Sequence, residues 1–502
     1  MVQRQSRRRA ALSTLVGTGA TVAITVAQAF ILIPLCLANL GTALYGAWLA
    51  ASELLIWLQF LDLGIPNLMT QRIGASVGRN DDIEAAQWAG TGLWALITVG
   101  AALTVLALIA APFIAMWVRV SAADADAFTA SFRIGALASA ILLTYNGVLG
   151  IARGAQLTGL MNAAQVAGAL TGLVVAIALL LAGFGVWALA FGLLARAVIS
   201  LLGAALFVIG ARRASGVRLG RPSAAVLRQM LGLAPSMGAA NAAYLLANNS
   251  ELLLVNTLFG PVPAAVYALT RRAMEGFRQL LDSIAWAVYG SFAHLVTAED
   301  RHRARTVLDE VLWLRLAAAC LCGAVVLAVN QPFVTLLFGA EHFGGVWLTA
   351  GFAVQMIVGG QTFLANYLLR ATGLVREGSI LLMSEAAARV AAIAAGLLMA
   401  GLAGAPWAAV AVSACALFVM RRALHRALPP ALSATSPPPM GSRLAPFALL
   451  AFGLAVAVVR IPVSWASVGG VAAALTIVGA VVLWWMLPPF VSDGSLMRWN
   501  RA

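Results

Sequence analysis

Four charged side chains recur at helical spacing within an otherwise apolar stretch of the chain. In "TRRAMEGFRQLLDS", Arg271, Glu275, Arg278 and Asp282 follow one another at intervals of four, three and four residues. This spacing puts all four on one face of an α-helix, with Arg272 beside them. A guanidinium group binds a carboxylate or a phosphate through two parallel hydrogen bonds. The stripe can therefore form ion pairs within the helix, bind an anionic group, or do both.

The elements that must carry this stripe are too apolar for a water-soluble domain. Of the 502 residues, 62% are hydrophobic and only 10% are charged, whereas soluble domains are about 25% charged. Apolar runs long enough to cross a hydrocarbon core of about 30 Å recur from end to end. We therefore predict an all-α polytopic membrane protein with about fourteen transmembrane helices. The predicted spans are 11–37, 43–69, 87–117, 128–151, 159–182, 185–210, 229–258, 262–292, 308–338, 345–370, 378–400, 404–421, 446–461 and 467–487.

The distribution of arginine predicts the orientation in the membrane. The net charge is +14, and all 32 basic residues are arginine. Those in loops, tails and span ends fall mostly on alternate sides, with only Arg119 and Arg460 in the opposite set. This asymmetry follows the positive-inside rule and argues against nucleic-acid binding. It predicts a multi-pass protein of a bacterial cytoplasmic (inner) membrane with both termini cytoplasmic. The basic start "RQSRRRAALSTLVGTGA" precedes an apolar run too long for a signal peptide, so it is interpreted as the first span.

Landmarks of the first half of the chain recur in the second half. "LGTALYGAW" precedes the span with Asp62, and "FGPVPAAVYAL" precedes the span with Asp282, 220 residues later. Six spans separate the copies, so both halves have the same orientation, which is typical of transporters. The expected domains are an N-terminal six-helix bundle at 1–213, a C-terminal one at 214–427, a Pro-rich cytoplasmic linker at 428–445, and two further transmembrane helices with a cytoplasmic tail at 446–502.

Charged side chains inside a membrane normally face a partner or a water-filled cavity. The simplest interpretation pairs Arg271 with Glu275, Arg278 with Asp282, and Arg389 with Glu385. Seven arginines nevertheless face five acids in the interior of the predicted spans, when Asp62 and the other charges at span ends are counted as interfacial. Positive charge is therefore left over, as suits an anionic cargo. The candidate ligands of an anionic head group are Arg271, Arg272, Arg278, Arg196, Arg315 and Arg389. The candidates for ion coupling or ion pairing are Glu53, Glu251, Glu275 and Asp282.

Asp62 lies near the end of the second predicted span, just before Arg72 and Arg79. A carboxylate is tolerated at this edge of the membrane. We expect Asp62 to anchor the loop rather than to contact a substrate.

Motifs of an enzyme are missing from the sequence. Without lysine there is neither a P-loop nor a Schiff base. The four histidines are scattered, and the outer loops are short. The four cysteines form no CxxC pair and are interpreted as core residues. We therefore expect no catalytic residue, no cofactor and no metal site.

Two stretches resemble a known family. "NLGTALYGAWLAASELLIWLQFLDLGIPNLMTQRIGASVGRND" is similar to the second span and following loop of polysaccharide-exporting lipid-carrier flippases (Wzx-type O-antigen and exopolysaccharide flippases). "LLLVNTLFGPVPAAVYALTRRAMEGFRQLLDSIAWAVYGSFAHL" resembles the equivalent region of their second half. They belong to the multidrug/oligosaccharidyl-lipid/polysaccharide exporter superfamily, and the resemblance covers about residues 10–425.

The resemblance implies two six-helix bundles in a V-shaped, inward- or outward-open arrangement, with spans one, two, seven and eight lining the cleft. It implies a cargo of polyprenyl-pyrophosphate-linked oligosaccharide, flipped to the outer leaflet by a monomer in contact with membrane lipid. A polysaccharide polymerase and chain-length machinery are the expected partners. Glu251 is the only acid available for the position where the family often carries one in the seventh span. The arginines are assigned by their chemistry rather than by alignment.

Other functions agree less well with the sequence. A cation-coupled multidrug exporter should have an acidic or neutral cavity, whereas the charges here are mostly basic. A peptidoglycan lipid-precursor flippase belongs to the same superfamily and stays open. A membrane glycosyltransferase, polymerase or ligase would need long outer loops, and a non-transporting scaffold would bury its arginines without a cavity. The energy source also stays open between a coupling cation bound by Glu53 or Glu251 and the substrate gradient.

Overall fold

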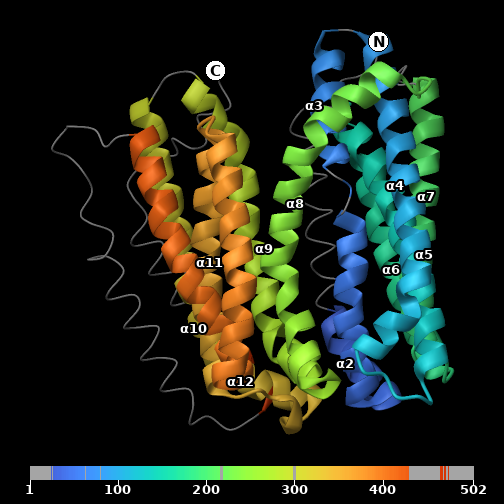
Figure 1. The fold of residues 1–502 in the computed structure, drawn as a ribbon, viewed down its shortest axis with the longest axis vertical. Helices are drawn as coiled ribbons and strands as arrows, with labels where there is room; N and C mark the ends of the chain where they lie inside the picture. Colours follow the sequence, from blue (N-terminus) through green and yellow to red (C-terminus); the bar gives the residue numbers. More distant parts are fainter. Residues whose placement is uncertain are drawn as a thin grey trace. The chain divides into compact units, whose positions relative to one another are not determined.

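The computed structural model describes residues 24, 27–60, 62, 64–79, 81–155, 157–214, 219–297, 301–428, 464–466, 469–470 and 473, and it is built of long helices (Figure 1). Within this part of the chain, eight helices are long and apolar enough to cross a membrane. The protein is therefore an all-α polytopic membrane protein, as its composition predicts. The predicted spans 446–461 and 467–487 lie largely outside the described residues, so the number fourteen stays a prediction.

The chain forms two compact units, Met1–Ala268 and Leu269–Ala502. The first contains η1 (Gln28–Leu32), α2 (Ile33–Phe60), α3 (Ile65–Gly78), α4 (Asp82–Trp117), α5 (Ala125–Gly154), α6 (Gly159–Leu181), α7 (Trp187–Ala214), α8 (Ala224–Phe259) and the start of α9 (Pro261–Thr297). The second contains the rest of α9, α10 (Arg301–Phe338), η2 (Ala340–His342), α11 (Val346–Ala371) and α12 (Val375–Ala427). The boundary between these units lies within α9, and the division into six-helix bundles at residue 213 stays a prediction.

The predicted span 43–69 is wrong as a single helix. α2 ends at Phe60 and α3 begins at Ile65, so a turn interrupts the predicted span. Gly64 has φ of 73° there, a conformation that glycine adopts without the clash of a Cβ atom. The backbone N–H of Gly64 donates to Oδ1 of the buried Asp62 at 2.8 Å. Asp62 therefore holds the turn, in agreement with its predicted anchoring role.

Two of the long helices contain a break at glycine. Gly41, with φ of 71°, interrupts α2 between the predicted spans 11–37 and 43–69. Gly401, with φ of 62°, interrupts α12 between the predicted spans 378–400 and 404–421. Each break allows one labelled helix to contain parts of two predicted spans. Helix α12, which is one of the eight apolar helices, therefore corresponds to two predicted transmembrane spans.

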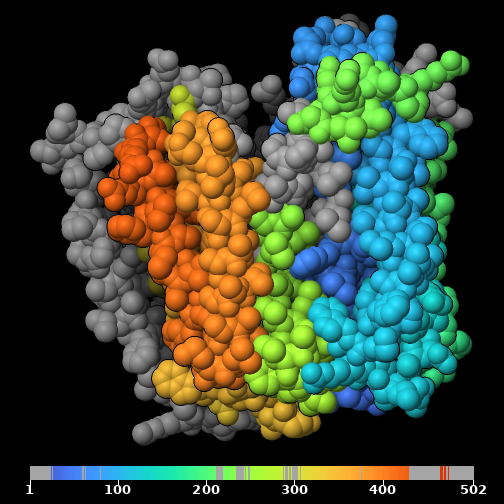
Figure 2. Space-filling view, in the orientation of Figure 1, coloured from blue at the N-terminus to red at the C-terminus, as the bar shows by residue number. Residues whose placement is uncertain are grey.

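Each unit has its own apolar core. In the first unit, Met69, Trp88 and Leu96 are buried together with residues of α5, α6, α7 and α8. In the second unit, Leu308 and Leu364 belong to a cluster formed by α9, α10, α11 and α12. Neighbouring helices such as α11 and α12 lie side by side (Figure 2). Packing against neighbours in this way fixes the rotation of each helix, and with it the direction of its few polar side chains.

Candidate functional site

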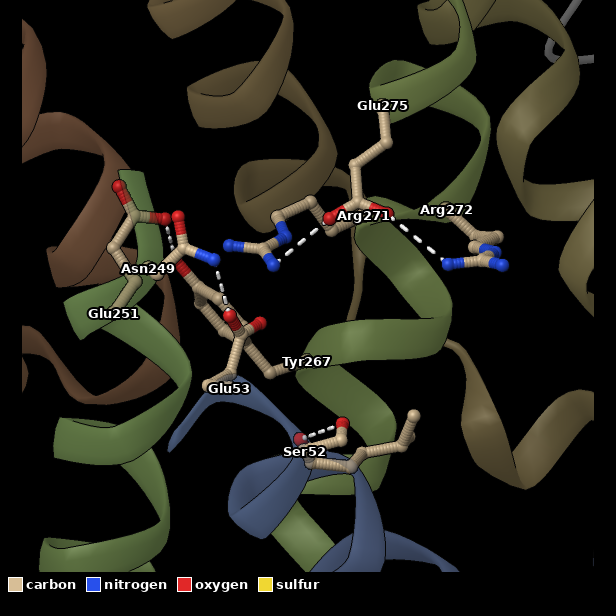
Figure 3. A network of polar contacts seen from close by, with 9 residues as sticks. Ser52, Glu53, Asn249, Glu251, Tyr267, Arg271, Arg272 and Glu275 are labelled. Carbon is tan, nitrogen blue, oxygen red and sulfur yellow. Dashed lines mark hydrogen bonds and ion pairs between the residues drawn. The ribbon is translucent and has the colours of Figure 1, made fainter. Parts of the chain in front are cut away.

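The middle of α9 carries a three-residue ion-pair cluster (Figure 3). Nη2 of Arg271 lies 2.8 Å from Oε1 of Glu275, one helical turn away. Nη1 of Arg272 lies 3.3 Å from the other carboxylate oxygen of Glu275. The sequence predicts the first contact and places Arg272 beside the stripe. One carboxylate thus holds two guanidinium groups in a fixed position, and the cluster carries a net positive charge.

Asp282, further along α9, also contacts two arginines. Nη1 of Arg278 lies 3.8 Å from Oδ2 of Asp282, as the helical spacing predicts. Nη2 of Arg315, on α10, donates to Oδ1 of Asp282 at 2.8 Å. The sequence does not predict this second contact, because the two residues are 33 positions apart and lie on different helices. A lone arginine in the apolar run after residue 310 was the available signal, since such a charge needs an acid on a neighbouring helix.

Glycine on α11 makes room for this buried arginine. Arg315 is fully buried, and a Cβ atom at Gly360 would overlap its guanidinium group. The next residue, Gln361, donates from Nε2 to the backbone oxygen of Leu312 at 3.1 Å. This bond ties α11 to α10 one turn from Arg315. The position of Arg315 is therefore set by the packing of three helices.

The first unit contains a polar cluster on α2, α8 and the first turns of α9 (Figure 3). Nδ2 of Asn249 donates to Oε2 of the buried Glu53 at 2.6 Å. The hydroxyl of Tyr267 donates to Oε2 of the buried Glu251 at 2.9 Å. The structure thus brings together polar residues of the second and seventh predicted spans. It also adds Tyr267, which lies one turn before Arg271 on α9 and which the sequence analysis missed.

The remaining candidates are on two other helices, α7 and α12. Arg196, on α7, is half-buried and packs against Gly172 of α6. Arg389 and Glu385 are buried on α12, where Oε1 of Glu385 accepts a hydrogen bond from Ser413 at 2.9 Å. The predicted pairing of Glu385 with Arg389 stays a prediction.

A buried hydrogen-bond network, also missed by the sequence analysis, fixes α9 just before the stripe. Nδ2 of Asn330, on α10, donates at 3.0 Å to both the backbone oxygen of Thr270 and Oγ1 of Thr349. The backbone N–H of Gly344 donates to Oγ1 of Thr270 at 2.9 Å. Asn330 interrupts an apolar run, and this was its only signal in the sequence. The network holds the residue before Arg271 against α10, α11 and the loop that joins them.

The arrangement is chemically suited to binding an anion. In the ion-paired set on α9 and α10, four arginines accompany two acids, so this set keeps two positive charges; its members are Arg271, Arg272, Arg278, Arg315, Glu275 and Asp282. Guanidinium groups bind phosphates well and do not lose their proton in proteins. In the described part of the chain, no group of three His, Cys, Asp or Glu side chains could hold a metal ion.

Residues 73–346, more than half of the chain, match the family described as polysaccharide biosynthesis protein. The chain belongs to this family. The matched region contains the entire α9 stripe and Arg315, whereas Glu53, Glu385 and Arg389 lie outside it. No curated protein matches the sequence significantly.

Solved structures with a similar fold are transporters. An inward-facing multidrug resistance MATE family transporter of the MOP superfamily has a TM-score of 0.64 and 16% identity, over 81% of this chain and 98% of that one. An outward-facing MATE family transporter has a TM-score of 0.63 and 17% identity, over 84% and 94%. A MATE protein in complex with MaL6 has a TM-score of 0.66 and 16% identity, over 84% and 95%. At such identities the likeness shows the fold alone.

Proposed function

We propose that this protein is a flippase that moves a polyprenyl-pyrophosphate-linked oligosaccharide from the cytoplasmic to the outer leaflet of the bacterial inner membrane. Membership of the polysaccharide biosynthesis family supports a role in making cell-surface polysaccharide. The MATE-like fold supports a role in transport rather than in catalysis. The excess of arginine on α9 carries the proposal, because a pyrophosphate head group is the part of such a cargo that needs positive charge.

In the proposed mechanism, the arginines of α9 bind the pyrophosphate head group while the lipid tail stays in the bilayer. Arg271 and Arg272 are held by one carboxylate, so their guanidinium groups are positioned before the cargo arrives. Preorganised groups lose little freedom on binding, which favours affinity. Arg278 lies two turns after Arg271 on the same face and extends the positive surface. Alternating access of the two halves then carries the head group across the membrane.

Reconstitution tests this function directly. The purified chain is placed in liposomes with a fluorescent polyprenyl-pyrophosphate oligosaccharide, and an impermeant quencher reports the lipid that reaches the outer leaflet. We expect protein-dependent flipping that requires the pyrophosphate. The double substitution Arg271→Ala with Glu275→Ala should lower the rate about tenfold or more, because a hydrogen bond to a charged group is lost. Wild-type liposomes that behave like protein-free ones would contradict the proposal.

The same liposomes separate the alternatives. Flipping of a peptidoglycan lipid precursor, but not of the other saccharide lipids, would identify a precursor flippase. Accumulation of lipophilic cations without flipping would identify a multidrug exporter. Formation of a longer saccharide chain would identify a polymerase or another glycosyltransferase. The arginine excess disfavours the cationic cargo, because like charges repel in a low-dielectric environment.

A further inference from the structure

Asp282 is shared unequally by its two arginines. Arg315 contacts one carboxylate oxygen at 2.8 Å, and Arg278 lies 3.8 Å from the other. The side chain of Arg315 is 0% exposed, whereas that of Arg278 is 29% exposed. The arginine on the neighbouring helix therefore makes the closer contact, although Arg278 lies only one turn from Asp282 on the same helix.

We propose that Arg315 is a positioning residue that neutralises Asp282 and thereby keeps the Arg278 guanidinium turned toward the anionic cargo. This inference rests on the proposed function and replaces the expectation that Arg315 binds the cargo itself. Without Arg315, Arg278 would be the arginine that still lies beside Asp282 among the described residues. Its guanidinium would then close onto the carboxylate and withdraw from a pyrophosphate group.

The surroundings of Arg315 support an indirect role. Two of its guanidinium nitrogens, Nε and Nη1, are buried without a hydrogen-bond partner among the described residues. Asp282 is therefore the acid that holds it, and the absence of a Cβ at Gly360 provides the space for its planar group. A side chain fully enclosed in this way cannot reach a cargo without a rearrangement of α10 and α11. Its charge can still act through Asp282.

The neighbouring glycines of α11 provide a matched pair of variants. Gly360→Ala should displace the Arg315 guanidinium, because the added Cβ would overlap it. Gly359→Ala is the control, because its Cβ would meet no atom closer than 3.8 Å. Arg315→Gln removes the charge itself. Arg315→Gln combined with Asp282→Asn removes both the charge and the carboxylate that would otherwise capture Arg278.

Two measurements on the full-length protein test the proposal. The first is the rate at which phenylglyoxal modifies Arg278, followed by mass spectrometry with Arg79 as the internal reference; the Arg79 side chain is 60% exposed. The second is the affinity for inorganic pyrophosphate, with inorganic phosphate as the comparison. The first measurement does not depend on the cargo, so it separates failure of this inference from failure of the proposed function.

We expect Arg315→Gln and Gly360→Ala to slow modification of Arg278 and to weaken pyrophosphate binding about tenfold or more, the scale of one lost charge-assisted hydrogen bond. Gly359→Ala should match wild type in both measurements. The double variant should regain wild-type reactivity and affinity, although it lacks Arg315. This recovery distinguishes positioning from direct binding, since a lost ligand cannot be restored by neutralising Asp282.

Three results would overturn the inference. Unchanged Arg278 reactivity in Arg315→Gln would show that Arg315 does not control that side chain. A folded double variant that still binds pyrophosphate weakly would make Arg315 a direct ligand. Equal effects of Gly359→Ala and Gly360→Ala would show that the position of the guanidinium does not matter. If Arg315→Gln alone fails to fold, the double variant still decides, because it leaves no unpaired carboxylate at this site.

Discussion

At the scale of single residues, the two carboxylates of α9 should respond differently to loss of an arginine. Arg271→Ala leaves Glu275 with Arg272 at 3.3 Å, so we expect a loss of about 1–3 kcal/mol in the free energy of unfolding. Arg315→Ala removes the closer partner of the buried Asp282 and empties an enclosed site, so we expect about 3–5 kcal/mol. Thermal unfolding in detergent measures both. A larger loss for Arg271→Ala would contradict this ranking.

How much of the site the sequence predicts depends on the distance between the partners along the chain. Arg271 with Glu275 and Arg278 with Asp282 are predictable, because helical spacing alone puts them within reach. The contact of Arg315 with Asp282 depends on how α10 is rotated against α9, which is set by packing rather than by periodicity. The same limit hid the contact of Tyr267 with Glu251. Nothing in the sequence indicates that the Tyr267 hydroxyl has a polar partner until the packing of α8 against α9 is known.

At the scale of helices, the backbones of α2 and of the start of α9 lie so close together in the first unit that a methyl group at Gly46 should not fit between them. A Cβ at Gly46 of α2 would overlap the backbone oxygen of Pro261, where α9 begins. Nη2 of Arg119 also donates to the oxygen of Thr257 at 2.9 Å, near the end of α8. Backbone atoms cannot move aside as a flexible side chain can. Gly46→Ala should therefore separate α2 from the turn between α8 and α9.

We expect Gly46→Ala to lower the melting temperature and the flipping rate together. The matched control is Gly210→Ala in α7, where an added Cβ would meet nothing within 4 Å. Alanine is favoured over glycine within a helix by about 0.5–1 kcal/mol, so this control should be neutral or slightly stabilising. A Gly46→Ala protein as stable and active as the control would mean that this contact is not needed.

The existence of the helices was easier to predict than their interruptions. Long apolar runs require helices, because unpaired backbone groups are costly in a membrane. The break after α2 depends instead on one local arrangement, in which Gly64 takes a positive φ and Asp62 holds its N–H. Both residues are compatible with a continuous span when read by hydropathy. The turn therefore became visible only in the structure, although the sequence did predict that Asp62 anchors a loop.

At the scale of the whole chain, the second unit should fold without the segment that follows α12, provided the end of that helix is kept. Nη1 of Arg305 donates to the backbone oxygen of Leu428 at 3.1 Å, and so joins the start of α10 to the end of α12. A chain ending at Ala431 keeps this contact, whereas a chain ending at Arg426 loses it. We expect membrane abundance to be normal for the first and lower for the second. Equal loss of both would show that later residues are required.

The last prediction concerns the energy source, which the sequence leaves open. Glu251, on α8, accepts a hydrogen bond from Tyr267 at 2.9 Å. Tyr267 lies on α9, one turn before Arg271. Protonation of Glu251 would change its charge and its capacity to accept that bond, so the state of this carboxylate is linked to the part of α9 that leads into the stripe. We therefore expect an imposed proton gradient to accelerate flipping through Glu251.

Glu251→Gln keeps the size of the side chain but removes its titration, so it should abolish the acceleration while slow flipping down a substrate gradient continues. Tyr267→Phe should weaken the acceleration without changing any charge in the neutral range, because it removes only the hydroxyl that joins α9 to Glu251. Glu53→Gln is the comparison, since the hydrogen bond from Asn249 to Glu53 joins α8 to α2. The measurement is the flipping rate in liposomes with and without a pH difference. Acceleration that persists in Glu251→Gln would place coupling elsewhere, and no acceleration in wild type would leave the substrate gradient as the driving force.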